Sequence, residues 1–111
     1  MDSIRVLKEI AAIADKARAD QREATSRAAY GWRFLGLPEP TAEDAAAAKR
    51  HDAAVRDASE RIDALLVKMR AAIKAEAEGH PDGVAFAIAH DATMADAEAI
   101  GAHVRAWAGR A

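Results

Sequence analysis

Histidine and carboxylate side chains are the first place to look for chemistry in this sequence, because together they can bind a metal ion or move protons. The histidines are His51, His80, His90 and His103. None of them forms an HExxH pair or a close pair with a second ligand on one helical face. A ligand or metal site is conceivable only around His90, Asp91 and Asp96. A hydrogen-bonded histidine in or near the core is the simpler interpretation of His90.

Other catalytic constellations are missing from the sequence. It contains no cysteine, which removes thiolate chemistry, disulfides and cysteine metal sites together. Its 6 glycines are scattered, so they form no glycine-rich loop for a phosphate. We therefore expect a protein that is not an enzyme and that uses no cofactor and no metal.

Aromatic side chains gather in the stretch YGWRFLGLPEP, residues 30–40, although aromatics make up only 5% of the chain. Trp, Tyr and Arg are enriched in binding hot spots, so this stretch is a candidate surface for a protein partner. The expected binding residues are Tyr30, Trp32, Phe34 and Leu37, with Arg27 and Arg33 beside them. We refer to these six residues as the aromatic tip.

Two polar features allow more than one interpretation. Asp52 and Ser59 fall on the seam of a heptad pattern, where they either mark a solvent-exposed edge or set the register or a partner contact. Residues 16–33 carry an excess of basic side chains, which suits a solvated helix face or a contact with an acidic partner. No aromatic side chains interleave with these basic residues, and the net charge is −2, so nucleic acid is not the expected partner.

Composition indicates an all-α fold. The chain has 111 residues, the size of a single domain, and 32 of them are alanine, the best helix former. β-branched and aromatic residues, the usual strand formers, are scarce. No apolar run is long enough to cross a membrane, and we expect a cytoplasmic protein from a bacterium, a phage or another mobile element.

Helix start and stop signals divide the chain into three predicted helices, over residues 3–35, 41–78 and 82–108, within one helical domain, 1–111. Gly36 and Pro38 end the first helix, because glycine suits a left-handed cap and proline cannot continue a helix. Thr41 and Asp82 can cap the second and third helices, and Gly109 ends the third. A possible break at residues 91–93 competes with an apolar stripe that runs through it, and the stripe favours one continuous helix.

Heptad spacing along the first two helices predicts an antiparallel hairpin with coiled-coil-like packing, and the third helix completes a three-helix bundle. With a turn near residue 38, residue i faces about residue 76 − i. This register pairs two alanine-rich stretches, residues 14–29 and 38–54, which we call the alanine-rich waist. The bulky side chains then gather at the end of the bundle away from residue 38. Val84, Phe86 and Ile88 are among them. A continuous third helix would then bring Trp107 level with residue 28, close to Tyr30 and Trp32.

Two functions from different classes follow from this fold. The first is a non-enzymatic interaction module, such as an inhibitor or adaptor of a larger protein complex, which binds through the aromatic tip. The second is a self-assembling structural protein, in which the alanine faces of the first two helices pack against a second copy to give a homo-oligomer.

Overall fold

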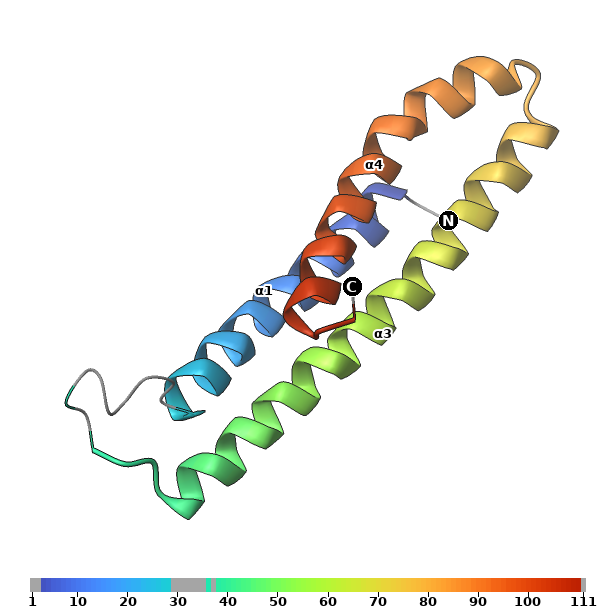
Figure 1. The fold of residues 1–111 in the computed structure, drawn as a ribbon. Helices are drawn as coiled ribbons and strands as arrows, with labels where there is room; N and C mark the ends of the chain where they lie inside the picture. Colours follow the sequence, from blue (N-terminus) through green and yellow to red (C-terminus); the bar gives the residue numbers. More distant parts are fainter. Residues whose placement is uncertain (1–2, 29–35, 37, 111) are drawn as a thin grey trace.

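The computed structural model describes residues 3–28, 36 and 38–110. It contains α1 (Ser3–Ala28), α3 (Ala42–Gly79) and α4 (Gly83–Trp107), and the described residues include no strand (Figure 1). Every helix packs against the other two. The fold is therefore an all-α three-helix bundle, as predicted, with extents of 64 × 20 × 20 Å.

The predicted helix starts are confirmed by their caps. The backbone N–H of Asp44 donates to Thr41 Oγ1 at 3.0 Å, and the Asp44 carboxylate accepts from the Thr41 backbone N–H, which together make a capping box. At the start of α4, Asp82 Oδ1 accepts from the backbone N–H of Ala85 at 3.1 Å. Each cap satisfies an N–H that the first turn of a helix leaves without a partner.

The predicted stop at Gly109 is confirmed as well. Gly109 has a φ of 68°, and its N–H donates to the carbonyl of Ala106, while the N–H of Arg110 donates to the carbonyl of Arg105. These two bonds form a Schellman motif, which favours glycine at the left-handed position. Gly36 also has a positive φ, of 67°, but residues 29–35 of the first predicted helix lie outside the described residues.

The third helix is continuous. α4 runs from Gly83 to Trp107 without a break at residues 91–93, as its apolar stripe predicted. Its buried residues Ala97, Gly101 and Val104 lie on that side of the helix. α4 approaches α3 closely at Gly101, where a Cβ atom would lie 2.9 Å from Leu66 Cδ1.

The core lies where all three helices meet. Its buried members are Val6, Ile10, Ala14, Ala17, Ala58, Ile62, Leu66, Met69, Ala97 and Val104. α1 and α3 supply equal shares of this core, and Ser59 is buried beside the heptad positions Ile62, Leu66 and Met69 of α3. Asp52, on the same predicted seam, is exposed.

The register between α1 and α3 differs from the expected one. His51 Nδ1 lies 2.8 Å from Asp20 Oδ1, and Arg27 Nη1 lies 3.1 Å from Asp44 Oδ1, so the residue numbers of each pair add up to 71. The expected sum of 76 is therefore wrong. In the observed register Ser3 lies level with about residue 68, and the last turns of α3 extend past the start of α1.

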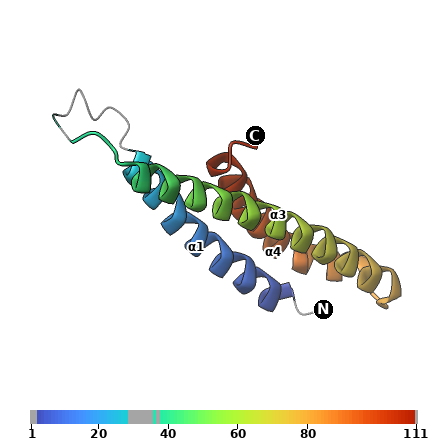
Figure 2. The same ribbon diagram turned by 90° about the horizontal axis from the view of Figure 1, so that it is seen from below.

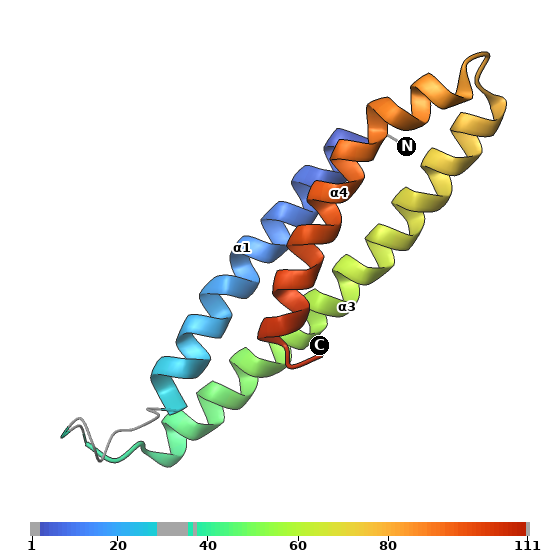
Figure 3. The same cartoon turned by 45° about the horizontal axis from the view of Figure 1, so that its top comes forward.

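This shift displaces α4 along α1. A hydrogen bond of 2.9 Å joins Ser3 Oγ and His90 Nδ1, so α4 has already made two turns before it reaches α1. Trp107 then lies beside Ala14 and Arg18 instead of level with residue 28. Figure 3 shows α4 ending partway along α1, between α1 and α3. The expected position of Trp107, level with residue 28, is therefore wrong, while Tyr30 and Trp32 lie outside the described residues.

We expect Ile62→Ala to lower the free energy of unfolding by about 2–5 kcal/mol, because Ile62 is 0% exposed and its loss leaves a cavity between the helices. Urea unfolding followed by circular dichroism measures the change. Ile4→Ala is the matched truncation at a site that is 58% exposed, and it should change stability by about 0.5 kcal/mol or less. Equal effects of the two substitutions would contradict this placement of the core.

Candidate functional site

The end of the α3–α4 hairpin has no fully buried residue. From Arg70 on α3, through the turn, to Asp96 on α4, every side chain is exposed or half-buried. Up to His90 on α4, which bonds to Ser3, this segment lies beyond the start of α1, so only two helices pack together there (Figure 2). A pair of helices without a third layer cannot cover both sides of the apolar residues between them.

An open groove lies along this end of the hairpin, with a volume of about 820 Å³. Its floor is mostly apolar and includes Ile73, Ala77, Val84, Ile88 and Met94. We call this surface the hairpin groove. Its apolar floor and its two helical walls match the kind of site that accepts the apolar face of another helix.

The groove opens on the side of the hairpin that faces away from α1. On α3, Arg61 lies beside α1, and Arg70 lines the groove nine residues later, which is about two and a half turns. On α4, Trp107 lies beside α1 and Glu98 lines the groove, again nine residues apart. In both helices, therefore, the side chains at the groove and at α1 point in opposite directions.

Charged side chains border the groove, and its two walls differ in net charge. The α3 wall carries Arg70, Lys74 and, near the turn, Glu78, whereas the α4 wall carries Asp91 and Glu98. Arg70 Nη2 lies 2.6 Å from Glu98 Oε1, and this ion pair closes one end of the groove. Both partners are about half exposed, so the pair adds little to the stability of the chain by itself.

Val84 and Ile88, which the sequence places at the bulky end of the bundle, are not part of the core. They are 73% and 70% exposed. A signal for this is present in the sequence, because Val84, Phe86 and Ile88 are two residues apart. On a helix such residues point about 200° apart, so they cannot all face one core.

Phe86 points to the other side of α4, where it packs between two histidines. Its ring centroid lies 5.3 Å from that of His80 and 4.3 Å from that of His90. His90 also bonds to Ser3, which is 5% exposed. In the part of the chain that the structure describes, no group of three His, Cys, Asp or Glu side chains is arranged to hold a metal ion.

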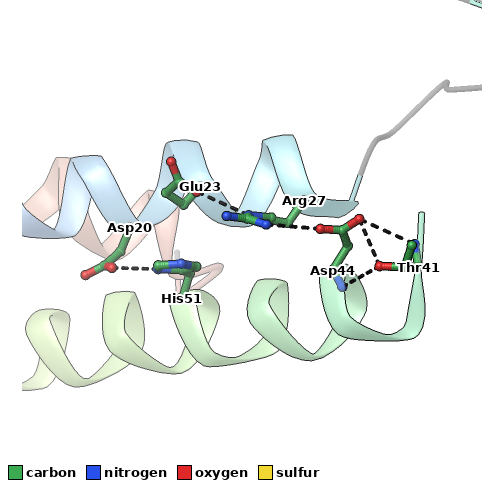
Figure 4. Close-up of polar contacts among 6 residues, drawn as sticks. All are labelled: Asp20, Glu23, Arg27, Thr41, Asp44 and His51. Atoms are coloured by element: carbon green, nitrogen blue, oxygen red, sulfur yellow. Dashed lines mark hydrogen bonds and ion pairs between the residues drawn. The ribbon is translucent and has the colours of Figure 1, made fainter. Parts of the chain in front are cut away.

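The aromatic tip is described only in part. Tyr30, Trp32, Arg33, Phe34 and Leu37 lie outside the described residues, so their role stays a prediction. Arg27 is described, and it lies at the end of α1 between two carboxylates (Figure 4). It donates to Glu23 on its own helix and to Asp44 on α3. The hydrogen bond from Arg27 lowers the pKa of Asp44.

A second polar contact joins α1 and α3 about two turns away, where His51 meets Asp20 (Figure 4). Lys16 also donates to Asp20, at 3.0 Å. Burial raises the pKa of Asp20, but the hydrogen bonds and positive charges of His51 and Lys16 outweigh it, and the net pKa is lowered. These contacts join the parts of α1 and α3 that lie beyond the end of α4.

The end of α4 is fixed to α3 by a cluster around Asp63. Arg105 and Arg110 donate to the two carboxylate oxygens of Asp63 at 2.9 and 3.0 Å. Arg110 also donates to Ser59 Oγ at 2.7 Å. Ser59 therefore has a structural partner within the chain, which accounts for a polar residue on the buried seam.

Comparison with known proteins identifies no relative: no family model, no curated protein and no solved structure matches the chain significantly. Among the helices of the described residues, none has both the length and the apolar character that crossing a bilayer requires.

Asp20→Asn should make the protein less stable near neutral pH, and the difference from wild type should vanish in acid. The folded-state pKa of Asp20 lies below its usual 3.8, so its carboxylate stabilises the fold above that pH. This contribution is lost as the pH falls through the lower folded-state pKa. Urea unfolding of both proteins between neutral pH and pH about 2.5 tests this.

Asp96→Asn is the control for this measurement, because Asp96 is exposed on α4 and far from the waist. It should leave the pH dependence of stability unchanged. A constant difference between wild type and Asp20→Asn down to the lowest pH would contradict the assigned role of Asp20.

Proposed function

We propose that this chain is a non-enzymatic protein-interaction module and that the hairpin groove is its binding surface. The observation that carries the proposal is the stretch from Arg70 to Asp96, in which no residue is buried although both helices present large apolar side chains. Contiguous apolar surface of this kind is a common mark of an interaction site.

A third helix in the hairpin groove would bury the apolar side chains that are exposed there. Burial of a side chain the size of valine or isoleucine contributes about 1.5–3 kcal/mol. Val84 and Ile88 alone thus offer several kcal/mol to a helix that covers them. The charged walls would limit which helices fit, because a partner must place opposite charges against Arg70 and Lys74 on one side and Asp91 and Glu98 on the other.

A bait experiment tests the groove as a binding surface. Wild-type protein and Ile88→Glu are immobilised and exposed to a lysate of the organism that makes the protein. Mass spectrometry should find proteins that the wild type retains and Ile88→Glu loses, because a carboxylate would have to be buried in the apolar floor. Ala85→Glu adds the same charge at an exposed position that does not line the groove, and it should capture what the wild type captures.

Identical captures by all three baits would contradict the proposal. The same experiment with Trp32→Ala and Phe34→Ala together tests the aromatic tip. Loss of capture in that variant alone would place binding at the tip instead of the groove.

A further inference from the structure

We propose that the occupant of the hairpin groove is a second copy of this chain, so that two α3–α4 hairpins pack face to face as a four-helix bundle. This proposal rests on the proposed function, since it names the partner of the same surface. Each α1 would stay on the outside of the bundle, because the groove faces away from it.

Charge on the groove walls is the main argument for a second copy. A two-fold axis that runs parallel to the helices keeps each residue at its own height and places α3 of one copy against α4 of the other. Arg70 lies at the height of Glu98, as their ion pair shows, and Lys74 lies between the heights of Asp91 and Glu98. Arg70 and Lys74 of each copy would thus meet Asp91 and Glu98 of the other, at both edges of the interface.

The other face-to-face arrangement is disfavoured by the same charges. A two-fold axis perpendicular to the helices would place α3 against α3 and α4 against α4. Arg70 and Lys74 would then share one edge with the same two residues of the second copy, where only Glu78 offsets their charge, and Asp91 and Glu98 of both copies would meet at the other edge. Like charges brought together across an interface are destabilising, so the charges favour the first orientation.

Apolar side chains would fill the centre of this dimer. Val84 and Ile88 of each copy lie near the turn, with Ala77 on the opposite wall. Val67, which is 62% exposed, lies one turn before Arg70 and extends the same row of α3. Each of these side chains occurs twice in a symmetric dimer, so a single substitution removes two contacts.

Several side chains of the alanine faces, in contrast, are used within one chain. Ala14, Ala17 and Ala58 are buried in the core of one chain, between α1 and the other helices. The homo-oligomer predicted from the sequence is therefore proposed at a different surface.

Light scattering coupled to gel filtration tests the dimer on purified full-length protein, from micromolar to near-millimolar concentration. The mass should rise from the 11.8 kDa of one chain towards twice that value. Ile88→Glu should weaken dimerisation on the order of 100-fold or more, whereas Ala85→Glu should dimerise as the wild type does. Circular dichroism confirms that both variants are helical, and Val84→Glu is a second groove variant if Ile88→Glu does not fold.

Crosslinking of introduced cysteines tests the orientation, since the chain has no cysteine of its own. Lys74 and Ala95 lie on opposite walls at similar height. A mixture of Lys74→Cys and Ala95→Cys should therefore form a crosslinked heterodimer, and Lys74→Cys alone should not. Asp96→Cys, one residue along and pointing away from the groove, is the control that should not crosslink to Lys74→Cys.

Each outcome separates this inference from the proposed function. A purified protein that stays monomeric at all concentrations overturns the dimer, and the lysate experiment then decides whether the groove binds a different protein. Crosslinking of Lys74→Cys to itself overturns the orientation. A dimer that Ile88→Glu leaves intact overturns the groove as the interface between copies.

Discussion

The register between α1 and α3 is the constraint on which the rest of the structure depends. The contacts Asp20–His51 and Arg27–Asp44 fix the two helices in one alignment, in which α1 begins level with about residue 68 of α3. About 11 residues of α3 then remain without α1, and the first turns of α4 pack against α3 alone. The hairpin groove is a direct consequence of this alignment.

Polar contacts have this influence because the helices meet there through small side chains. Alanine faces allow close approach but carry little shape that could select one alignment over the next, and burial of a methyl group contributes little free energy. Ion pairs and hydrogen bonds at defined positions supply the missing specificity, as polar residues do in coiled coils. The large side chains Ile10, Ile62 and Met69 then complete the core where α4 joins.

Local features of the fold were predictable from the sequence. The caps at Thr41 and Asp82, the stop at Gly109 and the continuous stripe of α4 each depend on residues near one another in the chain. The register was not predictable in the same way, because 13 residues, 29–41, connect α1 and α3 and do not dictate the alignment. The expected position of Trp107 was wrong because it was derived from the expected register.

The groove could have been found in part from the sequence. Val84, Phe86 and Ile88 cannot share one helical face, so some of them had to lie outside a three-helix core. Which of them stay exposed depends on the height at which α1 begins, and this comes from tertiary contacts. The binding role of the aromatic tip stays a prediction from the sequence pattern.

Nuclear Overhauser effects from the imidazole ring of His51, in isotope-labelled full-length protein, test the register most directly. We expect contacts between the ring proton next to Nδ1 and the β-protons of Asp20, because the two side chains are hydrogen-bonded. Contacts from that ring to Thr25, which the alternative register places level with His51, would contradict the alignment and the exposed hairpin end that follows from it.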